Sequence, residues 1–173
     1  FYSKKTANDV SFLKKITKNI NSKFLKNPKL YSPKITEYTS KIAKIKKVRQ
    51  LLRGHQRKFA TKKLAILEGR DMGTLFQNAD VKFFFKCSLK VAAKRRFKEF
   101  KKTNNKITLK KIEKAIGQRN LIDSTRKFSP LRIPLGAVIV DTTNMNKKQM
   151  FRQIFKVVED KLLLKYGRNY KAR

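Results

Sequence analysis

Three short apolar segments, set among stretches of helical periodicity, limit what this chain can fold into. They are residues 64–67, 81–87 and 137–140. Their continuous apolar character is typical of strands in a parallel sheet that is covered on both faces. Strands that alternate with helices along a chain predict an α/β domain with parallel strands.

Apolar residues recur at helical spacing in the segments around these strands. Those segments are residues 8–20, 33–45, 48–59, 89–102, 109–120 and 147–163. Several begin with a residue that suits a helix start: Asn8, Pro33, Ser88, Thr108 and Asn146. The last helix is predicted to turn an apolar stripe inward, consisting of Met150, Ile154, Val157, Val158, Leu162 and Leu163. We therefore expect one domain over residues 1–173, with a parallel sheet flanked by helices.

The charge of the chain is its strongest compositional signal. It contains 46 Lys and Arg against 11 Asp and Glu, which gives a net charge of +35. A chain with so much positive charge repels itself and favours a polyanion, and nucleic acid is the obvious one. The alternative is a basic soluble enzyme, although enzyme surfaces usually interleave both signs. The 40% of hydrophobic residues excludes a wholly disordered chain.

Single residues and the chain start add further limits. Cys87 is the only cysteine and cannot form an internal disulfide, which fits a reducing compartment. His55 is the only histidine, so no histidine-based metal site is expected. No apolar run of about 18 residues is present, so no membrane-spanning helix is expected. The chain begins at Phe1 rather than Met, so either a targeting segment was removed or preceding residues are missing.

The segment GQRNLIDSTR, residues 117–126, contains a charged triplet at helical spacing. Arg119, Asp123 and Arg126 stand at positions i, i+4 and i+7, so they share one helix face. Two guanidiniums with a carboxylate between them could hold a phosphate, with the carboxylate orienting one arginine. The alternative is a surface ion-pair ladder that adds little stability.

A polar loop lies between the first two predicted strands. In the segment ILEGRDMGT, Glu68, Arg70 and Asp71 surround Gly69 and Gly73. Charged residues in a tight loop at the end of a buried strand are typical of a substrate site. The glycines permit the turn whether or not a ligand binds there.

Taken together, these segments resemble bacterial cytidylate (CMP) kinase, which has the nucleoside monophosphate kinase fold. The resemblance runs from about residue 35 to the C-terminus through TSKIAKIKKVRQLLRGHQRKFA, ILEGRDMGT, ADVKFFFKCS, AKRRF, RNLIDSTR, SPL and VIVDTT, in the order of the family. It implies a nucleoside-monophosphate-kinase-like parallel sheet flanked by helices, with residues 103–130 as a lid-like segment. It also implies that inherited CMP contacts fall on Ser40, Arg49, Arg70, Asp71, Arg119, Asp123 and Arg126.

The 173 residues depart from that family in one major respect. A kinase of this fold needs a G-x-x-x-x-G-K-[ST] loop near its N-terminus, whose backbone N–H groups hold the donor phosphates. The chain contains no such loop, and its first glycine is Gly54. Asn120 stands where the family usually has Asp, and Ala92 stands where it usually has Arg. These departures predict a degenerate cytidylate kinase that is not an enzyme, with no catalytic residue, cofactor or metal.

The main hypothesis is therefore a non-catalytic, structural RNA-binding subunit of a ribonucleoprotein. By its basicity it would be a mitochondrial ribosomal protein derived from cytidylate kinase, located in the matrix, with rRNA and neighbouring ribosomal proteins as partners and no membrane contact. The predicted contacts to RNA phosphates are Lys44, Lys46, Lys47, Arg53, Arg57, Lys94, Arg95, Arg96, Lys98, Lys101, Lys102, Lys165, Arg168, Lys171 and Arg173.

Two alternatives remain open. One is an active cytidylate kinase, converting ATP and CMP to ADP and CDP, whose phosphate-binding loop lies outside this chain. The other is an inactive domain with residual binding of CMP or of a terminal nucleotide of RNA.

Overall fold

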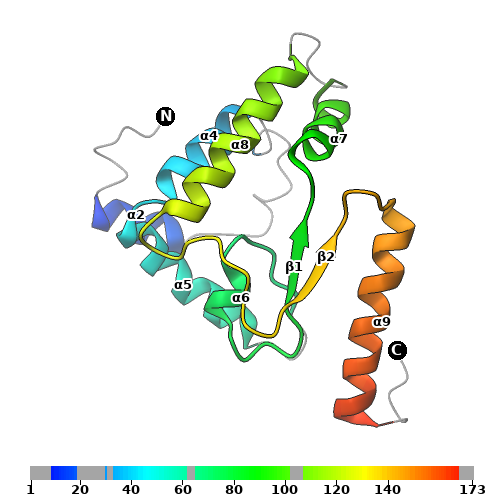
Figure 1. Cartoon of the computed structure of the whole chain (residues 1–173). Coiled ribbons are helices and arrows are strands. Elements are labelled where there is room, and N and C mark those ends of the chain that lie inside the picture. The colour runs from blue at the N-terminus through cyan, green and yellow to red at the C-terminus, as the bar shows by residue number, and fades with distance from the viewer. Residues whose placement is uncertain (1–8, 19–29, 31–32, 62–64, 102–106, 168–173) are drawn as a thin grey trace. The chain divides into compact units, whose positions relative to one another are not determined.

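The computed structural model describes residues 9–18, 30, 33–61, 65–101 and 107–167 (Figure 1). Two compact units form within the chain. The first combines Phe1–Gly69 with Arg119–Pro130, and the second combines Arg70–Gln118 with Leu131–Arg173. Helix α8, Leu109–Thr125, begins in the second unit and ends in the first.

The first unit is helical. It contains α2 (Val10–Lys18), α4 (Pro33–Ile42), α5 (Lys46–Ala60) and the end of α8, and α2 packs against α5. Helix α2 begins where the side chain of Asp9 accepts hydrogen bonds from the backbone N–H groups of Ser11 and Phe12, at 2.9 and 3.1 Å. The Ser11 hydroxyl also donates to this carboxylate and, with those N–H groups, lowers the pKa of Asp9. The predicted cap Asn8 lies outside the described residues.

The second unit is built on a two-stranded parallel sheet. It contains α6 (Met72–Leu75), β1 (Phe83–Lys86), α7 (Leu89–Lys101), the first part of α8, β2 (Val138–Asp141) and α9 (Lys147–Tyr166). Phe83 lies opposite Val138 and Lys86 lies opposite Asp141. The chain passes through α7 and α8 between the two strands (Figure 1), as the predicted parallel pairing requires. The α/β class and the small parallel sheet flanked by helices are confirmed.

The first of the three predicted strands, residues 64–67, is absent from the described residues. Residues 65–67 form no strand, Ile66 is 96% exposed, and Leu64 lies outside the description. A strand needs a neighbour for its backbone hydrogen bonds, and within the described part β1 pairs with β2 alone. The sheet is also not covered on both faces as predicted, because Phe85 and Ile139 remain about half exposed.

The helix starts follow the local sequence closely. The hydroxyls of Ser88 and Thr108 each accept a hydrogen bond from the backbone N–H three residues further on, at 3.3 Å. Asn146 and Gln149 form a reciprocal capping box at the start of α9, with two bonds of 2.9 Å. These bonds confirm the predicted starts of three helices.

The apolar stripe of α9 is only partly confirmed. Met150, Ile154, Val157, Val158 and Leu162 are half-buried, as predicted. Leu163, by contrast, is exposed, as are Phe151 and Phe155 on the same helix, whose rings stack at 5.9 Å. Leu163 is nine positions, or two and a half turns, beyond Ile154, so it lies on the opposite side of the helix from that stripe.

Candidate functional site

A buried ion pair lies at the end of α8. Nη1 of Arg126 donates to Oδ1 of Asp123 at 2.8 Å, and the two side chains are only 4% and 3% exposed. The residues are three positions apart, so one turn of helix brings the groups together. Burying one of these charges without the other would cost several kcal/mol. The fold can therefore bury Asp123 and Arg126 only as a pair.

Arg119 extends this cluster by one further turn. Its Nε lies 3.7 Å from Oδ2 of Asp123, while its side chain is 36% exposed. The sequence analysis placed Arg119, Asp123 and Arg126 on one helix face, and the structure brings all three together. Because Asp123 lies between both arginines, it holds each guanidinium in a defined direction.

Helix α5 contributes two more arginines to the first unit. Arg49 and Arg53 stand at i and i+4, so they share one face of α5. Nη1 of Arg49 donates to the backbone carbonyl of Ala43 at 3.4 Å. Nη2 of Arg53 donates to the hydroxyl of Ser129, just beyond α8, at 2.6 Å.

The segment after α8 therefore connects the two sets of arginines. The carbonyl of Ser129 accepts from Nε of Arg126 at 2.7 Å, while its hydroxyl accepts from Arg53. The neighbouring ring of Phe128 lies under Nζ of Lys46, 5.1 Å from the ring centroid. Sequence analysis missed Ser129, since it quoted the segment SPL only as part of a resemblance. Ser129 is 76 residues from Arg53, and periodicity does not reveal such contacts.

This arginine cluster consists of Arg53, Arg119 and Arg126 together with Asp123, and Arg49 stands one turn before Arg53 on α5. Three guanidiniums against one carboxylate leave the cluster cationic. Within the described residues, the buried Nε atoms of Arg53 and Arg119 have no hydrogen-bond partner. Partly buried cations and unused donors are stabilised by an anion with several oxygens, and phosphate meets that description.

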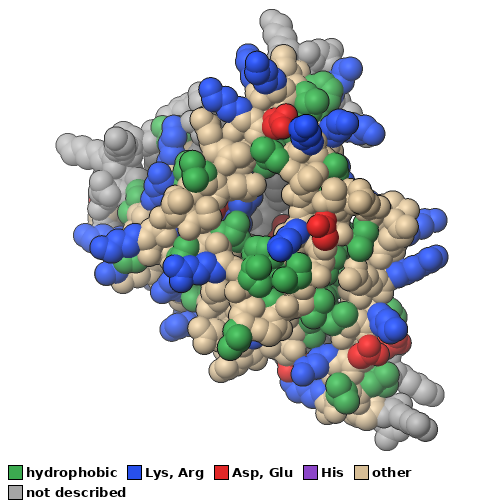
Figure 2. Space-filling model, in the orientation of Figure 1, with side chains coloured by type: hydrophobic (Ala, Val, Ile, Leu, Met, Phe, Trp, Pro, Cys, Tyr) green, Lys and Arg blue, Asp and Glu red, His purple; other side chains and the backbone are tan. Residues whose placement is uncertain are grey.

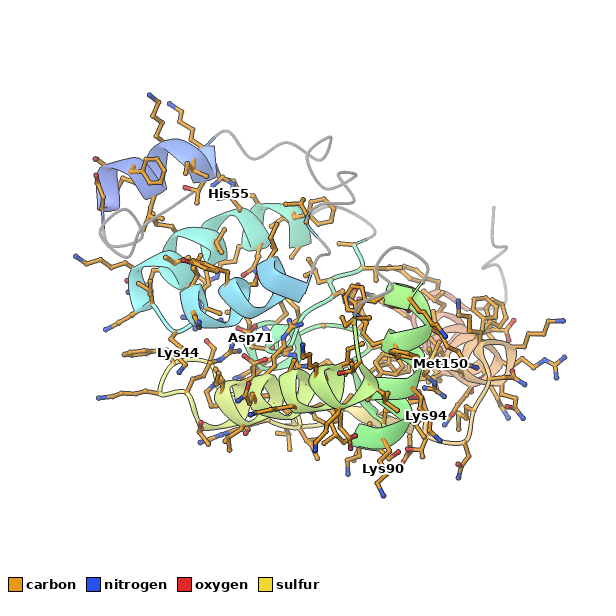
Figure 3. The ribbon with its side chains drawn as sticks, turned by 90° about the horizontal axis from the view of Figure 1, so that it is seen from above. Lys44, His55, Asp71, Lys90, Lys94 and Met150 are labelled. Carbon is orange, nitrogen blue, oxygen red and sulfur yellow. The ribbon has the colours of Figure 1, made fainter. Side chains whose placement is uncertain are left out.

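The other predicted CMP contacts are distributed as follows. Ser40 lies in α4, and its side chain is outside the described residues. Asp71 is buried at the start of α6 and is labelled in Figure 3. Its backbone carbonyl accepts from the N–H of Leu75 and the hydroxyl of Thr74, both at 2.9 Å. Arg70 precedes it and is half-buried. Asp71 and Arg70 belong to the second unit.

The loop that contains Asp71 requires a glycine at its next turn. A Cβ built on Gly73 would come 2.4 Å from Cγ of Pro134. Only a residue without a side chain allows this close approach. The geometry therefore explains Gly73 by packing against the segment before β2, independently of any ligand.

Polar groups also meet at the carboxyl ends of β1 and β2. Nη2 of Arg95 donates to the carbonyls of Thr142 at 2.7 Å and Met145 at 2.9 Å. The Thr143 hydroxyl accepts from the N–H of Ser88 at 2.9 Å. The hydroxyl of Thr143, and then its N–H, hydrogen-bond to the carboxylate of Asp141 and lower the pKa of Asp141. Ligands of parallel sheets bind at this edge, so the ordered loop here is a second feature of interest.

Most of the predicted RNA contacts lie on separate helices. On the face drawn in Figure 2, the Lys and Arg side chains are scattered rather than gathered at one place. Lys94 projects from α7 (Figure 3). The exposed ones are Lys44, Lys46, Lys47, Arg57, Lys94, Lys98 and Lys101. Those outside the described residues are Lys102, Arg168, Lys171 and Arg173. All of these stay predictions.

Some of the predicted contacts have partners within the protein. Arg53 and Arg95 bind the groups described above. Arg96 pairs with Glu99 at 2.8 Å, and Lys165 pairs with Asp80 at 2.7 Å. Arginines and lysines held in this way have fewer donors left for an external phosphate.

Other chemistries find little support among the described residues. His55 is exposed on α5 (Figure 3), and no group of three or more His, Cys, Asp or Glu side chains in the described part could hold a metal ion. Cys87 is half-buried and lies 3.6 Å from Nη1 of Arg95. No described helix is both long enough and apolar enough to cross a bilayer.

Comparison with known proteins identifies the family. The model of the cytidylate kinase family matches residues 4–160. Cytidylate kinase of Fusobacterium nucleatum is 39% identical over 162 residues, covering 87% of this chain and 74% of the relative. Cytidylate kinases of Caldanaerobacter subterraneus and Clostridium tetani are each 35% identical, covering 73% and 79% of this chain but 57% and 61% of their own lengths. The chain thus spans only part of each of these relatives.

These matches correct the main hypothesis of the sequence analysis. A protein that is not an enzyme, and a ribosomal protein of the mitochondrion in particular, was expected from the charge and from the absent phosphate-binding loop. The relatives are instead named for a kinase, with the match extending over most of the chain. High positive charge is a property of surfaces, and it does not decide between fold families. The chain belongs to the cytidylate kinase family.

Proposed function

We propose that this chain binds CMP as the phosphoryl acceptor of a cytidylate kinase, in the reaction of ATP and CMP to ADP and CDP. The charged triplet of α8, which is Arg119, Asp123 and Arg126, is the observation that carries the proposal. It combines a buried Asp123–Arg126 pair with the guanidinium of Arg119, and two guanidiniums around one carboxylate suit the phosphate of a nucleoside monophosphate. The names of the related proteins support the choice of CMP.

The chemistry of phosphoryl transfer explains why such a cluster is useful. An oxygen of the CMP phosphate must approach the terminal phosphate of ATP, and both groups are negatively charged. Guanidiniums around the acceptor phosphate reduce this repulsion and hold the attacking oxygen in line. Asp123 keeps the arginines oriented before the substrate arrives, so less ordering remains to be done on binding.

The donor half of the reaction requires residues that these 173 do not include. No G-x-x-x-x-G-K-[ST] sequence is present in them. In the proposed enzyme, a segment outside this chain holds the phosphates of ATP with backbone N–H groups and a lysine. The chain itself contributes the acceptor site and the lid-like segment.

Two measurements test the proposal. Calorimetry on the 173-residue chain measures CMP binding, with cytidine, AMP and UMP as comparison ligands. A coupled assay on the complete product of the gene measures ADP release from ATP, supplied as its magnesium salt, with and without CMP. We expect CMP to bind more tightly than cytidine, and the complete product to release ADP only when CMP is present. No binding at millimolar CMP, together with no CMP-dependent ADP release, would reject the proposal.

A further inference from the structure

Arg53 is joined to the charged triplet of α8 through a single residue. Its Nη2 donates to the hydroxyl of Ser129 at 2.6 Å, which connects α5 to the segment that follows α8. Neither the sequence analysis nor the proposed function assigns Arg53 to the CMP site. It was predicted as a contact to RNA phosphates.

Ser129 directs two guanidiniums at once. Its hydroxyl accepts from Arg53, and its carbonyl accepts from Nε of Arg126 at 2.7 Å. The backbone of Ser129 has φ of +49°, the left-handed region that residues with a side chain adopt uncommonly. That conformation is maintained by contacts on both sides, including the ring of Phe128 under Lys46. Ser129 is therefore fixed relative to both arginines.

The charge of Arg53 is not neutralised by this contact. Ser129 is a neutral partner, and no Asp or Glu among the described residues pairs with Arg53. Its buried Nε has no hydrogen-bond partner in the described part of the chain. A guanidinium has five N–H donors in one plane, so most of them stay available to a further acceptor. An anionic group beside Ser129 would accept hydrogen bonds from these donors.

We propose that Arg53 is an additional phosphate-binding residue of the acceptor site and that Ser129 is its positioning residue. Arg53 contacts an oxygen of the phosphate that the α8 arginines also bind, and Ser129 holds Arg53 and Arg126 toward that phosphate. The ligand class is a nucleoside monophosphate, and the contact is made to its phosphate rather than to its base. This inference rests on the proposed function.

The test compares two variants that separate binding from tethering. Arg53→Gln removes the charge but keeps an amide that can still donate to Ser129. Ser129→Ala removes the tether but keeps the charge. If Arg53 binds phosphate directly, Arg53→Gln weakens CMP binding by about 10- to 100-fold, the range for hydrogen bonds to charged groups, and Ser129→Ala weakens it only a few-fold. Arg57→Gln, at an exposed position one turn further along α5, is the matched control and stays within about twofold of wild type.

Two outcomes would overturn the inference. One is CMP affinity in Arg53→Gln equal to that of wild type. The other is an equal loss in Arg53→Gln and Ser129→Ala, which is the result expected of a tether alone. Unfolding midpoints of all variants, followed by circular dichroism, identify any loss that comes from misfolding.

A second readout keeps this test separate from that of the proposed function. Inorganic phosphate is titrated into the wild type and into Arg53→Gln, with the arginine Nε–H signals followed by NMR. A wild-type chain that does not bind CMP would reject the proposed function. A wild-type Arg53 signal that responds to phosphate would still support the inference in that case, and one that does not respond would overturn it.

Discussion

Nη1 of Arg126 lies 2.8 Å from Oδ1 of Asp123, and both side chains are almost completely removed from solvent. With 46 Lys and Arg against 11 Asp and Glu, most basic side chains of this chain cannot pair with a carboxylate, but Arg126 does. Asp123 also lies 3.7 Å from Nε of Arg119 through its other oxygen. One carboxylate thus organises two arginines, and its removal should affect both folding and ligand binding.

Asp123→Asn preserves the shape of the side chain and removes its charge. Because Arg126 would then be buried beside a neutral amide, we expect the free energy of unfolding to fall by about 3 kcal/mol. Urea denaturation followed by circular dichroism measures the change. Glu99→Gln is the control, because its pair with Arg96 is exposed and should change stability by less than about 1 kcal/mol. An unchanged urea midpoint in Asp123→Asn would show that the pair does not stabilise the fold.

Arg119→Ala should separate binding from stability. The Arg119 side chain is 36% exposed and its contact with Asp123 is long, so the unfolding free energy should change by less than about 1 kcal/mol. CMP affinity should fall by about 10- to 100-fold, because a charged donor to the phosphate is lost. Calorimetry with CMP measures the affinity, and Lys114→Ala, exposed on the same helix, is the control. Equal CMP affinity in the two variants would remove Arg119 from the site.

Replacing glycine with alanine should change stability in opposite directions at Gly73 and Gly54. At Gly73 an alanine Cβ would collide with Pro134 at 2.4 Å, so Gly73→Ala should destabilise the second unit by about 1–3 kcal/mol. At Gly54, within α5, nothing lies within 4 Å of the added Cβ. Gly54→Ala should therefore stabilise the protein by about 0.5–1 kcal/mol through helix propensity. Thermal unfolding measures both variants, and a stabilising Gly73→Ala would contradict the observed packing.

The pair of Asp80 and Lys165 predicts a dependence on pH. The hydrogen bond and charge of Lys165, whose Nζ lies 2.7 Å from Oδ1, lower the pKa of Asp80, and the same contact raises the pKa of Lys165. The carboxylate therefore stabilises the folded state above its unfolded pKa, and this stabilisation is lost as the pH falls through the lower folded value. The stabilisation from Lys165 is lost instead as the pH rises through its raised folded pKa.

Carboxyl carbon shifts measured by NMR between neutral and acidic pH report the Asp80 pKa directly. In Lys165→Met the pKa of Asp80 should return upward toward its ordinary value. High salt should shift it in the same direction, because both side chains are exposed and screened. A pKa that is the same in wild type and Lys165→Met would contradict the assignment.

Local sequence predicted the helix starts and the two paired strands well. A serine, threonine or asparagine cap acts on N–H groups within three residues, so Ser88, Thr108 and Asn146 could be identified from neighbours alone. The i, i+4, i+7 spacing of the α8 triplet is equally local. The strand predicted over residues 64–67 is absent from the described part of it, residues 65–67, because an apolar run becomes a strand only when another strand pairs with it.

Contacts distant in sequence account for what was missed. Arg53 and Ser129 are 76 residues apart, and Arg95 is 47 residues from Thr142. From the sequence alone, only the positive charge of Arg53 and Arg95 was evident, so both arginines were predicted as contacts to RNA phosphates. The structure gives them partners within the protein, which depend on how the helices pack and not on any periodicity. Charge alone therefore could not tell a guanidinium that binds an outside phosphate from one that holds a loop.

Arg95 provides the last prediction, because its contacts are to the backbone of the loop after β2. Arg95→Met should destabilise the protein by about 1–2 kcal/mol, since the carbonyls of Thr142 and Met145 lose a shared charged donor. Amide hydrogen exchange should quicken in residues 142–146. Arg95→Lys should not restore protection, because an ammonium cannot reproduce the planar fork. Lys94→Met, at the exposed position that precedes Arg95 in α7, is the control. Full protection in Arg95→Met would mean that the loop is held by its other bonds, chiefly that from Ser88 to Thr143.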